Sequence, residues 1–195
     1  MQSIVFMNPY TLEYYYNQNM IPFPDKKEFL IMLSGLCGYA CQMAVREEKK
    51  SFVLVTAGGK NYFFGDALNY YLINSENSFI NLMKETFENL FRNIDFPDWK
   101  KILKNVDLNI GNKNYKINNL FNPEDKFPDY LKNWNDIFDL IKRNTNKPEE
   151  WPFILTYVLD IFMTTYFKHF GGKKLIELFP IVIENAFYTS KIIAE

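Results

Sequence analysis

The two cysteines are the side chains best suited to nucleophilic chemistry in this sequence. Cys37 and Cys41 stand one helical turn apart, and a cysteine thiolate attacks readily when a nearby base lowers the pKa of the thiol. His169 is the only histidine that could act as this base, and Asp160 or Asp66 could orient its imidazole. These residues define one hypothesis, a thiol-dependent hydrolase that uses Cys37 or Cys41 with His169.

The surroundings of both cysteines favour packing over catalysis. They lie within the apolar segment 29–45, and burial among aliphatic side chains raises the pKa of a thiol and leaves it unreactive. A single histidine beside one cysteine pair does not provide the paired ligand clusters that structural zinc needs. We therefore predict no catalytic residue, no cofactor and no metal site, with Cys37, Cys41, Asp160 and His169 as the candidates to test.

Asp160 belongs to a polar line on an otherwise apolar helical segment. Thr156, Asp160, Thr164 and Lys168 recur every four residues and therefore share one helix face. Such a line is either the wall of a polar cleft or a strip that faces water, and the second is the usual role of a polar helix face. No second carboxylate stands at a spacing that would pair with Asp160, so the sequence predicts no acid–base pair of the glycosidase type.

A stripe of small residues runs along the helix expected at 25–47, which Asp25 is predicted to cap. Small side chains at positions i, i+3, i+4 and i+7 leave a shallow groove, so a backbone or a ligand can approach the helix closely. A ligand in this groove gives a second hypothesis, a binder of a small apolar molecule in a helix-lined cavity. The residues of the stripe are Ser34, Cys37, Gly38, Cys41 and Ala44.

A β-hairpin is predicted directly after this helix. Residues 51–57 and 61–64 are rich in β-branched and aromatic side chains, and the Gly58-Gly59 pair between them suits a turn with positive φ angles. Gly65-Asp66 then ends the second strand and begins a short helix at 67–73, and a second helix cap is expected around Ser75 to Ser78. This helix–hairpin–helix unit is the best specified part of the chain.

Aromatic side chains are unusually frequent, at 18% of the residues. Neighbouring residues in a strand point to opposite faces, so runs of rings along the hairpin cannot all lie against one core. Because exposed aromatic residues commonly anchor protein interfaces, recognition of another protein is the function that this composition favours. The predicted binding residues are Tyr62, Phe64, Asp66, Tyr70 and Tyr71.

The remainder of the chain is predicted to be mainly helical. A second, smaller hairpin is expected around the Gly111-Asn112 turn, and a loop is expected around Asn122-Pro123 and Phe127-Pro128. The last helix contains Pro180, which should kink it. The helices are expected at residues 79–94, 99–105, 130–141, 151–170 and 173–194.

These elements predict an α+β, mainly α fold with a helical bundle-like core and one or two short antiparallel β-hairpins. The length favours a single domain over residues 1–195. Within it we expect an N-terminal arm at 1–24, the helix–hairpin–helix unit at 25–73 and the mainly helical remainder at 74–195.

The overall charge and the apolar segments limit the classes of partner. A net charge of −1, with no long run of either sign, argues against nucleic-acid binding. The N-terminus lacks the features of a secretory signal, and no segment is a clear membrane span. We therefore expect a cytoplasmic, non-enzymatic protein-binding module, such as an inhibitor or an immunity-like neutraliser of a partner protein. The wide apolar arc of the last helix further predicts a homodimer through this C-terminal helix.

Overall fold

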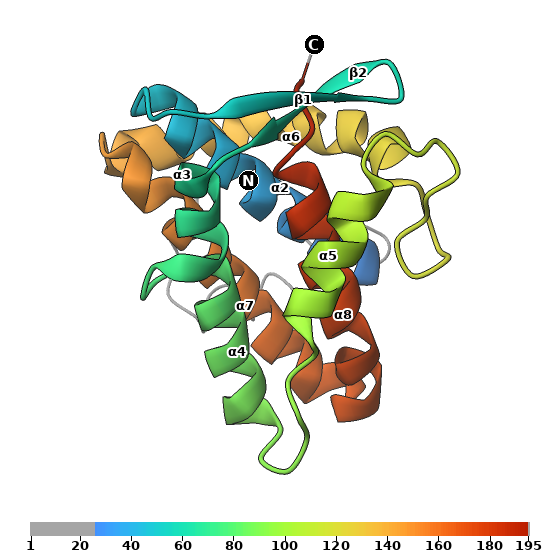
Figure 1. Cartoon of the computed structure of the whole chain (residues 1–195). Coiled ribbons are helices and arrows are strands. Elements are labelled where there is room, and N and C mark those ends of the chain that lie inside the picture. Colours follow the sequence, from blue (N-terminus) through green and yellow to red (C-terminus); the bar gives the residue numbers. More distant parts are fainter. Residues whose placement is uncertain (1–25, 195) are drawn as a thin grey trace.

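A computed structural model describes residues 26–194 of the chain. Helices form most of it, and one two-stranded antiparallel sheet lies across one end (Figure 1). The predicted α+β, mainly α fold class is confirmed. The N-terminal arm predicted at 1–24 and the helix cap expected at Asp25 lie outside the described residues.

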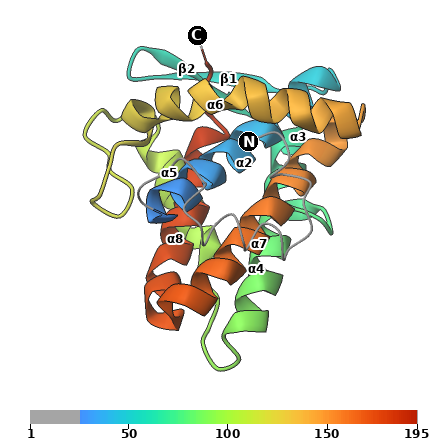
Figure 2. The same ribbon diagram turned by 180° about the vertical axis from the view of Figure 1, so that it is seen from behind.

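The central element is helix α2 (Lys26–Glu47), which is apolar on all sides and buried along most of its length. Helices α7 (Trp151–Phe170) and α8 (Gly172–Thr189) pack along it, and α6 (Pro123–Asn144) lies across it (Figure 2). By length and composition α2 could cross a membrane, yet 83% of its most apolar stretch is buried by the rest of the fold. This burial is the ordinary condition of a core helix.

The predicted hairpin is confirmed, with strands β1 (Val53–Ala57) and β2 (Lys60–Phe64) joined by a glycine turn. Leu54 lies opposite Phe63 in the antiparallel register. On its other edge β2 meets the C-terminal segment, because the Phe63 N–H donates to the Lys191 carbonyl oxygen at 2.8 Å. Strand β2 is therefore covered on both edges, whereas β1 is the outer strand of the sheet.

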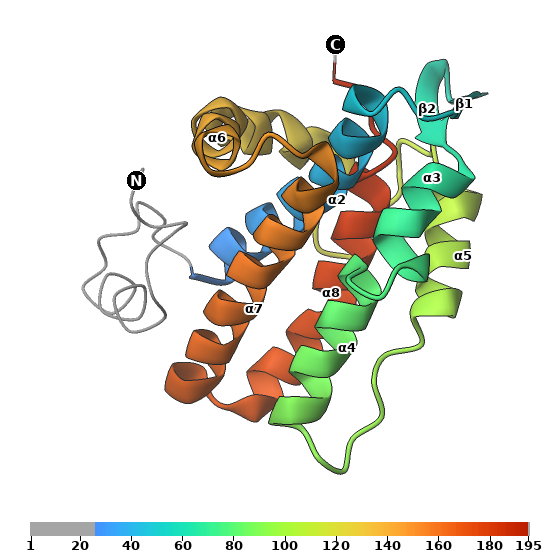
Figure 3. The same ribbon diagram turned by 90° about the vertical axis from the view of Figure 1, so that its left-hand side faces the viewer.

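The elements after the hairpin follow the predicted order. Helix α3 (Asp66–Asn69) continues into a π-helical turn (Tyr70–Asn74), and α4 (Phe79–Leu90) follows. The Ser78 side chain accepts the Asn81 N–H, so the predicted cap near Ser78 is confirmed. Figure 3 shows α4, α7 and α8 side by side beneath the hairpin.

The predicted second hairpin is wrong. Residues 107–109 complete helix α5 (Trp99–Asn109), and the loop after it contains only an isolated bridge between Ile117 and Phe121. A Cβ atom added to Gly58 would lie 2.1 Å from the Gly111 carbonyl oxygen. The Gly111 turn therefore packs against the turn of the first hairpin and forms no hairpin of its own.

The predicted loop at 122–128 is also wrong, because α6 begins at Pro123. The Asn122 side chain accepts the Glu124 N–H at 2.8 Å, and Pro123 occupies the first turn, where its missing N–H costs nothing. Pro128 lies inside the same helix. A short 3-10 turn (Pro148–Glu150) then leads into α7, which ends at Phe170, directly before Gly171.

The last helix ends at Thr189 instead of continuing to 194. The Gln42 side-chain amide donates to the carbonyl oxygens of Ser190 and Ile192, each at 3.0 Å, so this segment lies between α2 and β2. The second half of α8 is almost entirely buried by neighbouring helices of the same chain. Its wide apolar arc is thus covered internally and no longer argues for a homodimer through this helix.

Candidate functional site

Cys37 and Cys41 are completely buried in the core. Burial raises the pKa of both thiols, and in Cys37 a hydrogen bond with the Thr156 side chain only partly opposes this effect. Neutral, enclosed thiols are poor nucleophiles. Their environment therefore supports packing as their role.

The fold does not bring His169 to either cysteine. Phe29 contacts Phe162, and Cys37 contacts Thr156 eight residues further along α2, so α2 and α7 run antiparallel. His169 follows Thr156 along α7 by about 20 Å at a rise of 1.5 Å per residue. This separation exceeds the reach of an imidazole, although the His169 side chain itself lies outside the described part of the structure.

The small-residue stripe of α2 is occupied by α8. A Cβ atom added to Gly38 would lie 2.0 Å from the Ala186 carbonyl oxygen. Asn185 donates its side-chain amide to the Ile31 carbonyl oxygen at 2.7 Å, and the Thr189 hydroxyl donates to the Gly35 carbonyl oxygen at 2.8 Å. The close approach is confirmed, and a backbone fills the groove in which a small ligand was the alternative.

The polar line through Asp160 packs against other helices for part of its length. Thr156 is buried beside Cys37, and Asp160 accepts the Thr86 hydroxyl of α4 at 2.8 Å. Burial raises the pKa of the Asp160 carboxyl group. The prediction of a water-facing strip is wrong for Thr156, and Asp160 is half-buried at a helix contact.

The five predicted binding residues divide into a buried and an exposed group. Tyr62 and Tyr71 are buried, Phe64 is half-buried, and Asp66 and Tyr70 are exposed. The Tyr71 hydroxyl donates to Glu48, whose carboxylate also pairs with the Lys50 ammonium at 3.0 Å. Of this set, Asp66 and Tyr70 remain open to a partner.

Tyr62 fixes the hairpin to the helices through Glu124. The Glu124 carboxylate accepts the hydroxyls of Tyr62 and Tyr188, the latter at 3.0 Å, and pairs with the Lys60 ammonium at 2.7 Å. Burial alone would raise the pKa of Glu124, but these hydrogen bonds lower it below the usual value. One carboxylate therefore joins β2, α6 and α8.

A second carboxylate, Glu184 of α8, holds the loop after α5. It accepts the Tyr115 hydroxyl and the Asn105 side-chain amide, the latter at 3.3 Å. The Tyr115 ring stacks on Tyr188 with the centroids 5.4 Å apart, which links this site to Glu124. No local sequence pattern identifies this group of side chains, because their hydrogen-bond partners are distant in the sequence. Its members are Glu124, Glu184, Tyr115 and Tyr188.

The buried Glu184 predicts a specific pH dependence of stability. Burial raises the pKa of Glu184, and the hydrogen bonds from Tyr115 and Asn105 only partly oppose this effect. The folded state therefore holds its proton at higher pH than the unfolded state, so the stability contribution of Glu184 is complete below the unfolded pKa of about 4.3 and declines as pH rises through the folded pKa. Urea unfolding of wild type and Glu184→Gln from neutral to acidic pH measures this difference.

In this titration the stability of the wild type relative to Glu184→Gln should rise as the pH falls. The variant serves as the reference because every other carboxyl group titrates equally in both proteins. A difference that stays constant or shrinks on acidification would contradict a raised pKa for Glu184.

Strand β1 remains exposed beside the contacts that Glu124 and Glu184 make. Four consecutive apolar side chains at and before its start are exposed, each by 41% or more, and Tyr70 nearby is 51% exposed. Solvent-facing edges of this kind usually carry charges or prolines that prevent pairing with another chain, but residues 51–57 contain neither. We call this set the β1 edge, and it consists of Phe52, Val53, Leu54 and Val55.

Comparisons with protein families, with curated proteins and with solved structures found no match. Among the described residues, no group of three or more His, Cys, Asp and Glu side chains could hold a metal ion. The geometry of this chain is therefore the basis for assigning a function.

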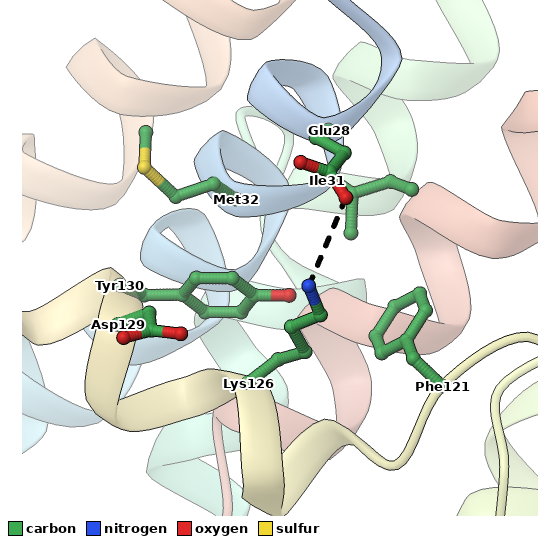
Figure 4. A pocket seen from close by; sticks show the side chains of 7 residues that line it. All are labelled: Glu28, Ile31, Met32, Phe121, Lys126, Asp129 and Tyr130. Atoms are coloured by element: carbon green, nitrogen blue, oxygen red, sulfur yellow. Dashed lines mark ion pairs between the residues drawn. The ribbon is translucent and has the colours of Figure 1, made fainter. Parts of the chain in front are cut away.

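A small pocket of about 200 Å³ lies between α2 and α6 (Figure 4). The Tyr130 ring forms one wall, and the Lys126 ammonium pairs with the Glu28 carboxylate at 3.8 Å beside it. Its charged residues are thus already partnered within the chain. Because this pocket is small and its charged side chains are already paired, it is a weaker candidate for a binding site than the β1 edge.

Proposed function

We propose that this protein is a non-enzymatic protein-binding module that captures an extended segment of its partner along the β1 edge. The observation that carries the proposal is the row of exposed apolar side chains from Phe52 to Val55 on the outer strand of the sheet. An outer strand offers unpaired backbone N–H and C=O groups, and alternating side chains beside them select the sequence of an added strand.

The support around the β1 edge favours a preformed binding site. Phe52 stacks on the buried Phe63 with the ring centroids 4.4 Å apart, so the start of the strand is held in place. The neighbouring strand β2 is held in place by its hydrogen bonds with Glu124 and with the C-terminal segment. A rigid edge loses little conformational entropy when a partner strand is added.

The proposal includes a role as an inhibitor or an immunity-like neutraliser, which would act by covering the bound segment of its partner. The cytoplasmic location stays a prediction. A thiol hydrolase has less support, because both thiols are enclosed and His169 lies far along α7.

A library of random linear peptides displayed on phage tests the proposal directly on the full chain. We expect the selected peptides to be rich in alternating apolar and β-branched residues. Their affinity for the Leu54→Lys variant should be lower than for the wild type by about tenfold or more. Bound peptide should also slow hydrogen exchange of the β1 amides. Peptide affinity is measured by fluorescence anisotropy, and exchange is measured by mass spectrometry.

Ile94→Lys is the matched control, since Ile94 is exposed by 46% and Leu54 by 48%. Ile94 lies in the segment between α4 and α5, at the opposite end of the molecule from the hairpin (Figure 1). Equal losses in both variants, or peptides that bind without protecting β1, would overturn the proposal. A wild-type dimer that Leu54→Lys dissociates would instead assign the edge to a second copy of the chain.

A further inference from the structure

A positively charged face covers α5 and the loop that follows it. Five exposed lysines lie in residues 99–119, and none of them forms an ion pair within the described part of the chain. Asp107 is the only acidic residue in this range and pairs with Lys191 at 3.2 Å. In a chain of net charge −1, such a face is a local excess of positive charge. Its lysines are Lys100, Lys101, Lys104, Lys113 and Lys116.

Part of this positively charged face is hollow. A cleft of about 840 Å³ is lined by Lys101, Lys104 and Lys116, together with asparagine side chains and the Glu184 carboxylate, which already accepts two hydrogen bonds within the chain. Its wall also includes Leu108, which is exposed by 75%. Ammonium and carboxamide donors around an apolar contact suit a polypeptide that carries carboxylates.

The positively charged face is continuous with the β1 edge. The Gly111 turn packs against Gly58, at the point where β1 turns into β2 (Figure 1). A chain that runs along β1 past Ala57 therefore reaches the loop that carries Lys113 and Lys116. The apolar edge and the lysines can meet one partner together.

We propose that the positively charged face binds an acidic segment of a partner protein, next to the segment that pairs with β1. This inference rests on the proposed function and adds the charge of the partner. Charge complementarity favours an anion, and the adjoining neutral apolar strand favours a polypeptide over a nucleic acid, whose charged phosphates would gain nothing from it.

A fluorescent oligoglutamate of about twelve residues is the probe, and it is titrated against the full chain by anisotropy. We expect binding that weakens between about 50 mM and about 300 mM NaCl, because salt screens exposed charges. The triple variant Lys101→Gln, Lys104→Gln and Lys116→Gln should lose about tenfold in affinity, because each exposed charge pair contributes modestly and three of them are removed together.

The matched control is the triple variant Lys84→Gln, Lys132→Gln and Lys147→Gln, which removes the same charge from other exposed positions. It should bind the probe as the wild type does. Equal loss in both triple variants, no binding at low salt, or tighter binding of a short DNA duplex of equal charge would overturn the inference. Leu54→Lys separates the two proposals, because it should abolish capture of the selected peptides and leave oligoglutamate binding intact.

Discussion

Gly38→Ala is expected to lower the free energy of unfolding by about 3 kcal/mol or more. The added methyl group would lie 2.0 Å from the Ala186 carbonyl oxygen and 2.6 Å from the Thr189 hydroxyl oxygen. The first of these atoms belongs to the backbone of α8 and cannot rotate away, so α8 would have to move off the central helix. Interiors packed as densely as crystals do not absorb such a shift without loss.

The sign of this effect separates packing from helix propensity. Propensity alone predicts that Gly38→Ala stabilises the protein by about 1 kcal/mol. Gly35→Ala is the graded control, because its methyl group would meet the Tyr130 ring at 2.6 Å and the Asn185 side chain at 3.1 Å, and side chains can shift. Urea unfolding followed by circular dichroism should rank wild type above Gly35→Ala and Gly35→Ala above Gly38→Ala. A Gly38→Ala protein as stable as wild type would contradict the α2–α8 contact.

Local signals in the sequence were sufficient for the first part of the fold. The apolar segment of α2, the Gly58-Gly59 turn and the cap at Ser78 each lie within the element that they specify, and all three predictions are confirmed. The Gly111 and Pro123 signals failed because each has two local interpretations. Tertiary contact decided between them, as the Gly111 turn packs on the hairpin and Pro123 begins a helix.

The candidate site depended on contacts that no local pattern contains. The aromatic runs predicted binding residues in β2 and at Tyr71. The C-terminal segment at Lys191 instead pairs with β2, so β1 is the outer strand. The aliphatic side chains of β1 are exposed, whereas Tyr62 is buried and donates to Glu124. Alternation along a strand predicts two faces, but it does not identify the strand at the edge of the sheet.

Asp107→Ala is expected to destabilise the protein by about 3 kcal/mol, because removal of one partner leaves a buried charge without compensation. The Lys191 side chain is only 3% exposed, and its ammonium lies 3.2 Å from the Asp107 carboxylate and 4.2 Å from the centre of the Phe64 ring. Asp107 itself is 44% exposed, so we take the lower end of the range for buried pairs.

The pH dependence of the Asp107→Ala variant follows from the same burial. Burial lowers the pKa of Lys191, and the nearby Asp107 carboxylate partly opposes this effect. Without Asp107 the pKa should fall further, so between the folded pKa and the unfolded value of about 10.4 the unfolded state binds more protons than the folded state. The stability of Asp107→Ala should therefore rise with pH in that window, and more steeply than that of the wild type.

Removal of the buried charge should rescue the Asp107→Ala variant. Lys191→Met replaces the lysine with an apolar side chain of similar length and removes the charge. The double variant Asp107→Ala with Lys191→Met should therefore recover most of the lost stability and lose the added pH dependence. Lys191→Met alone leaves the half-exposed Asp107 carboxylate in contact with water, and its effect should be the smaller of the two single changes. Urea unfolding of all four proteins gives the coupling energy. If the losses in unfolding free energy of the two single variants simply add in the double variant, Lys191 does not depend on Asp107. The segment after α8 would then be held by its backbone contacts with β2 instead.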